Sequence, residues 1–277
     1  MTTRPMKVAR VSGRYDMHYV DAGQGEPVLL IHGLAGDHHA WDAQVEAWSS
    51  RYRVIAPDNR GTGLSTQVDE PITIADMAGD FLDLMTQLGI ERFHLVGRSM
   101  GGCIGQLMSL AAPRRVASMV WMASTARFDR LGHRRLECHS EWLQRTGDWA
   151  SWGRQAINDF VSDRFFVENP EAIARIESLI AGTQRLPACY IRQNAAVRAH
   201  DAVDRLRDIG CPVLILSGGL DPLAGPQATR WMVEATPDVR WVNFEQSSHF
   251  FFLEEPARFM QVTSDWLAEQ AAASGAV

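Results

Sequence analysis

The chain has 277 residues, of which 46% are apolar and 22% are charged, as is typical of a soluble globular enzyme. Its formal net charge of −6 argues against a basic face for nucleic acid or for anionic lipid. Lys7 is the only lysine, which rules out Schiff-base catalysis and a phosphate-binding P-loop. We therefore expect a small-molecule ligand.

The cysteines and the amino-terminal segment bear on where the protein resides. Cys103, Cys138, Cys189 and Cys211 lack the spacing of metal ligands, so we expect reduced thiols and no metal site. The amino-terminal segment contains no hydrophobic signal region, and no apolar run approaches the roughly 20 residues of a membrane span. These features predict a cytoplasmic protein without membrane attachment, and they leave open whether it forms a homo-oligomer.

Short apolar runs alternate with helical patterns along most of the chain, which indicates an α/β fold with a mostly parallel, doubly wound sheet. Alternation over 7–20 predicts an additional antiparallel hairpin at the sheet edge. The alternation breaks over 124–208, where helical periodicity with many aromatic residues predicts a helical cap inserted into a core formed by 1–123 and 209–277. Expected strands are 28–32, 53–57, 93–96, 116–122, 213–217 and 240–244, and expected helices are 41–49, 74–88, 99–111, 170–181, 187–198, 225–234 and 256–269.

Ser99 follows one of these strands within the run Gly97-Arg98-Ser99-Met100-Gly101. A serine between such glycines, at a turn from strand to helix, is the pattern of a nucleophile elbow. The turn holds the serine backbone in a strained conformation, and glycines let the neighbouring chain pass close by. The pattern predicts that Ser99 is a nucleophile.

Two further residues stand where the partners of such a serine belong. A serine hydroxyl needs a base, and the base needs a third group that fixes its tautomer. Asp221 comes directly after the strand expected at 213–217, and His249 follows the strand expected at 240–244. The order serine, acid, histidine is the one this architecture uses, so we expect a triad of Ser99, Asp221 and His249.

The oxyanion that forms during acyl transfer needs two backbone N–H donors. One comes from the residue after the nucleophile, here Met100, and the other comes from the loop after an earlier strand. Gly33 permits a tight turn in that loop, so Leu34 is the expected second donor. His32 is expected to be a structural hydrogen-bonding residue.

With these motifs the chain resembles the α/β hydrolases over essentially its whole length, and within them it is most similar to 3-oxoadipate enol-lactonases and aminoacrylate hydrolases. The resemblance implies a small lactone, ester or amide-like substrate, with or without a carboxylate, and neither metal nor organic cofactor. It is carried by the segments 31–33, 58–65, 97–102, 219–221 and 248–250, and for the subgroup by 41–49 and 194–201.

Within this resemblance several residues are candidate substrate contacts. Arg98 stands where close relatives are expected to have histidine or a small apolar residue, and it either pairs with a substrate carboxylate or forms an internal salt bridge. The cap residues Trp142, Arg192 and Arg198 and the loop residue Phe250 are the other candidates.

Two alternatives to an ester or lactone hydrolase stay open at the level of sequence. A carbon–carbon bond hydrolase of the meta-cleavage type shares the serine motif, but such enzymes usually have asparagine and tryptophan where Arg98 and Phe250 stand. A ligand receptor built on the same fold can keep an intact triad without turning over its ligand. Turnover of a chromogenic ester separates an enzyme from a receptor.

Overall fold

The computed structural model describes residues 5–273 and 275 and contains one eight-stranded sheet with the order β1-β2-β4-β3-β5-β6-β7-β8. Strands β1 and β2 form an antiparallel hairpin, β2 pairs antiparallel with β4, and the remaining neighbours are parallel. The strands are β1 (Lys7–Val11), β2 (Tyr15–Ala22), β3 (Glu26–Ile31), β4 (Tyr52–Pro57), β5 (Phe93–Arg98), β6 (Val116–Met122), β7 (Val213–Gly218) and β8 (Val239–Phe244).

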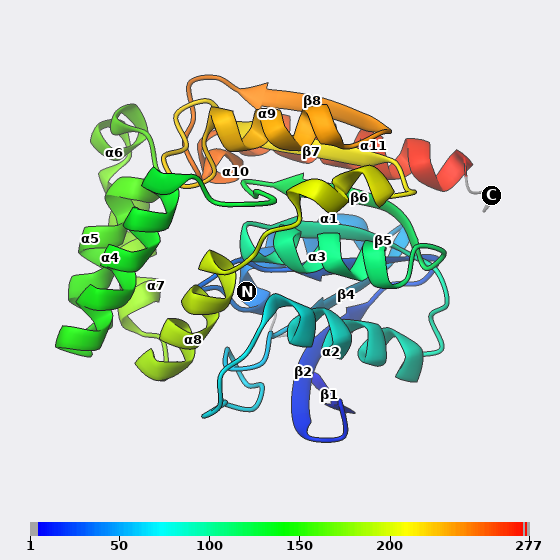
Figure 1. The fold of residues 1–277 in the computed structure, drawn as a ribbon, viewed down its shortest axis with the longest axis horizontal. Helices are drawn as coiled ribbons and strands as arrows, with labels where there is room; N and C mark the ends of the chain where they lie inside the picture. Colours follow the sequence, from blue (N-terminus) through cyan, green and yellow to red (C-terminus); the bar gives the residue numbers. More distant parts are fainter. Residues whose placement is uncertain (1–4, 274, 276–277) are drawn as a thin grey trace.

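Helices cover both faces of this sheet (Figure 1). One face packs against α2, α3 and α9 through buried side chains such as Phe81, Ile104 and Met232. The other packs against α1 and α11 through side chains such as Trp48 and Trp266. Coverage on both faces explains why the central strands are almost continuously apolar. The core helices are α1 (Asp42–Trp48), α2 (Ile74–Gln87), α3 (Met100–Ala111), α9 (Pro226–Ala235), α10 (Phe251–Glu254) and α11 (Pro256–Ala273), with 3-10 turns η1 (His38–Trp41) and η2 (Val203–Asp208).

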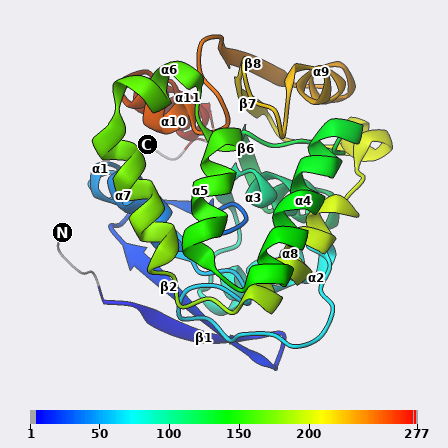
Figure 2. The ribbon, with the colours of Figure 1, turned by 90° about the vertical axis from the view of Figure 1, so that its left-hand side faces the viewer.

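Five helices between β6 and β7 gather at one end of the sheet, and we call them the cap (Figure 1). Seen from that end, α5 lies between α7 on one side and α4 with α8 on the other (Figure 2). The cap has its own buried aromatic cluster around Trp149, Trp152 and Tyr190. The cap helices are α4 (Arg130–Thr146), α5 (Trp149–Phe160), α6 (Asp163–Glu168), α7 (Pro170–Ala181) and α8 (Pro187–Arg198).

The fold class expected from the sequence is confirmed, and the expected strands recur with ends shifted by at most a few residues. Sequence patterning missed α10, a single turn formed by Phe251–Glu254 directly after the loop that carries His249. The separation of 124–208 as an independent domain stays a prediction. Among the described residues, no helix has both the length and the apolar character needed to cross a bilayer.

Candidate active site

Ser99 lies between the end of β5 and the start of α3, with φ 51° and ψ −115°. A positive φ is costly for a residue with a side chain, so the surrounding structure must hold it in place. The N–H of Ser99 donates to the carbonyl of Met122 at 2.8 Å, which ties the turn to β6. The turn also needs its glycines, because a Cβ on Gly97 would lie 2.4 Å from the Gly101 carbonyl oxygen and one on Gly101 would lie 2.1 Å from that of Ile31.

Asp221 and His249 are held together at the ends of the two neighbouring strands β7 and β8. Nδ1 of His249 lies 2.8 Å from Oδ2 of Asp221, and both side chains are almost completely buried. Because a carboxylate only accepts, Nδ1 carries the hydrogen and donates it. The other carboxylate oxygen, Oδ1, accepts the N–H groups of Leu223 at 2.8 Å and Ala224 at 3.0 Å. Asp221 is thereby fixed from two sides.

Ser99 and His249 line one cavity beneath the cap, together with Gly33 and Leu34 of the loop after β3. The cavity has a volume of about 30 Å³, and most of its wall is apolar. Phe160 of the cap stacks on Phe250, with ring centroids 4.8 Å apart, and its ring centroid lies 6.0 Å from that of His249. The other lining side chains are Arg98, Phe128, Leu136, His139, Trp152, Tyr190, Val197 and Leu223.

The loop that carries Leu34 is held by His32, as expected for a structural histidine. Nδ1 of His32 donates to the Gly33 carbonyl at 2.9 Å, and Nε2 accepts the N–H of Asn59 at 3.1 Å. Complete burial lowers the pKa of His32 to about 4, so this ring stays neutral and keeps both bonds at neutral pH. Met100 is the first residue of α3, so its N–H has no acceptor within the helix and is available to a ligand.

Arg98 lines the same cavity and is only 9% exposed. Burial lowers its pKa to about 10, partly opposed by the charge of Asp37, so the guanidinium is protonated at neutral pH. Its guanidinium carbon lies 4.9 Å from the ring centroid of Phe252 and 5.8 Å from the centroids of Trp41 and Phe250. The internal salt bridge considered from the sequence does not occur among the described residues.

Three cap residues expected at the substrate do not reach this cavity. Trp142 is 41% exposed and donates from Nε1 to Ser151 Oγ at 3.0 Å on the outer side of α4. Arg192 pairs with Asp69 at 2.7 Å, and Arg198 donates to the side chains of its neighbours Asn194 and Glu137.

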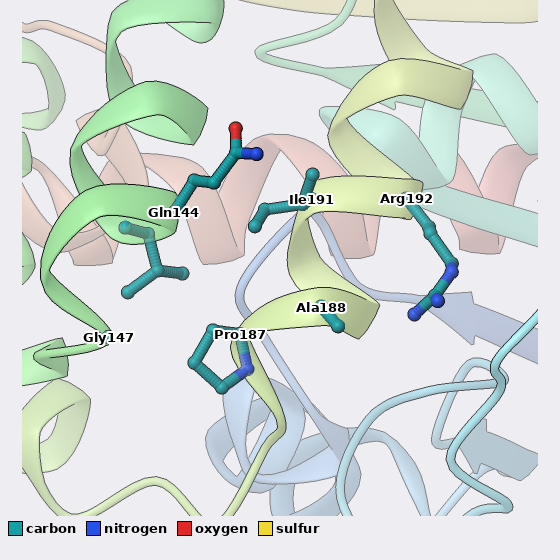
Figure 3. A pocket seen from close by; sticks show the side chains of 7 residues that line it. Gln144, Gly147, Pro187, Ala188, Ile191 and Arg192 are labelled. Carbon is teal, nitrogen blue, oxygen red and sulfur yellow. The ribbon is translucent and has the colours of Figure 1, made fainter.

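Arg192 instead lines a second hollow of about 460 Å³ between α4 and α8 on the cap surface (Figure 3). Its other lining residues are Leu143, Gln144, Gly147, Pro187, Ala188 and Ile191. None of Ser99, Asp221 and His249 contributes to it, so the candidate chemistry lies in the smaller cavity.

The structure also adds a polar group that sequence reasoning missed. His139 of α4 is 2% exposed, lines the same cavity as Ser99 and places Nε2 2.9 Å from Oδ2 of Asp159 in α5. Arg135 pairs with the other oxygen of the same carboxylate. These partners lower the pKa of Asp159 against the opposing effect of burial. No local motif marks this pair, because its members come from different helices.

Comparison with protein families identifies the fold. A family model described as "alpha/beta hydrolase fold" matches residues 26–256. The chain is an α/β hydrolase. In this α/β hydrolase Ser99, Asp221 and His249 each follow the end of a parallel strand.

Named relatives of this α/β hydrolase are hydrolytic enzymes. The chain is 30% identical over 261 residues to "Putative carbamate hydrolase RutD" of Azorhizobium caulinodans, covering 93% of this chain and 97% of that one. A thermophilic esterase from Thermogutta terrifontis has a TM-score of 0.85 at 27% identity, covering 96% and 99% of the two chains. The enol-lactonase from Burkholderia xenovorans LB400 has a TM-score of 0.85 at 26% identity, covering 95% and 100%. The chain is thus an enzyme of the α/β-hydrolase class.

Proposed function

We propose that the protein is a serine hydrolase that cleaves a small carboxylic ester or lactone through an acyl-enzyme. The observation that carries this proposal is the convergence of Ser99 and His249 on one cavity, with His249 hydrogen-bonded to the buried Asp221 at 2.8 Å. An aligned acid fixes the histidine tautomer with the hydrogen on Nδ1, which leaves Nε2 free to accept a proton.

The proposed reaction begins when His249 takes the proton of the Ser99 hydroxyl as its oxygen attacks the substrate carbonyl. The N–H groups of Leu34 and Met100 hold the oxyanion, and Asp221 stabilises the imidazolium that forms. His249 then gives its proton to the leaving oxygen. Water, deprotonated by His249, hydrolyses the acyl-enzyme and restores Ser99.

The size of the cavity sets a condition on this reaction. A volume of about 30 Å³ has room for about one or two water molecules, whereas small-molecule sites usually measure about 300–1,000 Å³. Substrate entry therefore requires cap helices or lining side chains to move apart.

One second candidate activity rests on a specific comparison. The relative from Azorhizobium caulinodans carries the name of a carbamate hydrolase, and a carbamate presents the same kind of carbonyl to Ser99. Carbamates therefore belong in the substrate panel beside esters and lactones. Hydrolysis of vinylogous diketones would indicate the alternative activity, that of a carbon–carbon bond hydrolase.

The proposal is tested by multiple-turnover hydrolysis of short-chain 4-nitrophenyl esters and simple lactones. We expect turnover by the wild type, a loss in kcat of at least about 1,000-fold in Ser99→Ala, and no change in Ser178→Ala, a matched control on the exposed surface of α7. Binding without turnover would indicate the receptor alternative. Turnover that persists in Ser99→Ala would contradict the proposed nucleophile.

A further inference from the structure

Arg98 is a buried cation that has no anionic partner within residues 5–273. A buried arginine is normally paired with an acid and hydrogen-bonded, because an unpaired charge is costly to bury. Arg60 follows that rule, with bonds of 2.5 and 2.6 Å to the two carboxylate oxygens of Asp80. The guanidinium of Arg98 makes no hydrogen bond or ion pair with any residue that the structure describes. The Arg98 guanidinium is therefore suited to bind an anionic group of a ligand.

The immediate surroundings compensate the charge only in part. The rings of Trp41, Phe250 and Phe252 attract the cation through their faces, but they do not accept the N–H bonds of a planar guanidinium fork as an oxygen would. Asp37 is the acid whose charge acts on Arg98, yet its carboxylate does not come within ion-pairing distance of it. The fork keeps its capacity for two parallel hydrogen bonds.

The guanidinium of Arg98 lies close to the proposed nucleophile, Ser99. Arg98 and Ser99 are adjacent in the chain and line one cavity. A Cβ built on Gly33 would lie 3.1 Å from the Cβ of Ser99 and 3.6 Å from Nε of Arg98, so both side chains lie close to one point of the loop after β3. A group held by Arg98 would sit beside the oxyanion loop.

A second buried arginine, Arg185, lies near the same loop, and the charges of Asp37 and Asp58 act on it. Arg185 is 5% exposed and donates from Nη2 to the carbonyl of Gly36 at 2.6 Å. The neighbouring carboxylate of Asp58 is already engaged by His38, whose Nδ1 lies 2.8 Å from it. Arg185 and Asp58 thus already have partners, whereas the fork of Arg98 is left for an anion.

We propose that Arg98 binds a carboxylate of the substrate, so that the natural substrate is an ester or lactone with a carboxylate on its acyl part, a few bonds from the carbonyl that Ser99 attacks. Planar carboxylate and planar guanidinium match in a bidentate pair. The inference rests on the proposed serine hydrolysis and adds its specificity. Two other roles for Arg98, stabilising the oxyanion or only packing against the aromatic rings, predict equal effects on charged and neutral substrates.

The test compares two 4-nitrophenyl esters whose acyl chains have equal length, the monoester of adipic acid and the hexanoate. We expect kcat/KM of the wild type to be at least about tenfold higher for the acid ester, because hydrogen bonds to charged groups have this strength. In Arg98→Gln the ratio of the two kcat/KM values should fall by at least about tenfold, and in Arg98→Lys, which keeps the charge without the fork, by less. The control Arg114→Gln removes an exposed arginine beyond α3 and should leave the ratio unchanged.

An unchanged ratio in Arg98→Gln, or a wild type that does not prefer the acid ester, would overturn the proposal. A binding measurement separates this failure from a failure of the proposed reaction. Calorimetric titration of Ser99→Ala with monomethyl adipate should show binding that Ser99→Ala/Arg98→Gln loses, while methyl hexanoate should bind both variants equally. Equal binding of monomethyl adipate to both variants would refute the carboxylate site whether or not Ser99 is the nucleophile.

Discussion

Replacing Asp221 by asparagine should abolish most activity without disturbing the fold. Oδ1 of Asp221 accepts two backbone N–H groups, from Leu223 and Ala224, and Oδ2 faces Nδ1 of His249. In Asp221→Asn the amide oxygen must stay on the backbone donors, because an NH₂ group there would face two hydrogens. The NH₂ group then points at Nδ1, which can only accept it, and the ring hydrogen moves to Nε2. His249 in this tautomer has no lone pair for Ser99.

The expected cost follows from losing the base while keeping the rest of the site. A wrong tautomer in a serine–histidine–aspartate triad lowers kcat by about 10⁴-fold, which corresponds to about 5.5 kcal/mol. We expect a loss of about 10³- to 10⁴-fold in kcat for ester hydrolysis, with a free energy of unfolding within about 1 kcal/mol of the wild type because both backbone bonds persist. Asp238→Asn, an exposed change of equal charge, is the control. A loss smaller than tenfold in Asp221→Asn would refute this role for Asp221.

Two further predictions concern stability. Gly101→Ala should lower the free energy of unfolding by about 3 kcal/mol or more, because its Cβ would lie 2.1 Å from the Ile31 carbonyl oxygen. Gly79→Ala, at an exposed position of α2, should raise the free energy of unfolding by about 0.5–1 kcal/mol. Urea denaturation measures both values, and equal effects of the two substitutions would contradict the close packing of Gly101. Burial lowers the pKa of His200 to about 4, below the roughly 6.5 of an exposed imidazole, so the unfolded chain binds more protons between these values. The free energy of unfolding should therefore fall as pH drops from about 6.5 to 4, by up to about 3 kcal/mol from this group; His200→Asn should flatten that decline, and an unchanged slope would contradict it.

The sequence located those site residues that stand at the ends of predicted strands. Ser99, Asp221 and His249 each follow a strand of a parallel sheet, and the carboxyl ends of such strands meet along one edge. Strand periodicity and chain order were therefore sufficient to predict that these three residues lie close together. Their catalytic role stays a prediction until the variants are assayed.

The cap residues were harder to place for a physical reason. Helical periodicity shows that α4 has a buried face, but not which neighbour that face meets, and α8 has almost no hydrophobic periodicity although its Cys189 and Val197 are buried. The side chain of Trp142 is exposed on the cap surface, and Arg192 forms an ion pair with Asp69, which is distant from it in the sequence. His139 gave no signal at all, since its partner Asp159 stands on another helix.

The most direct test of the triad is the rate at which a fluorophosphonate labels the protein, followed by intact-protein mass spectrometry and peptide mapping. Such a reagent forms a stable bond only with an activated nucleophile. We predict one phosphonyl group per chain, on Ser99, and labelling of His249→Ala that is slower by at least about 1,000-fold. Labelling at another residue, or an equal rate in His249→Ala, would contradict a Ser99 nucleophile activated by His249.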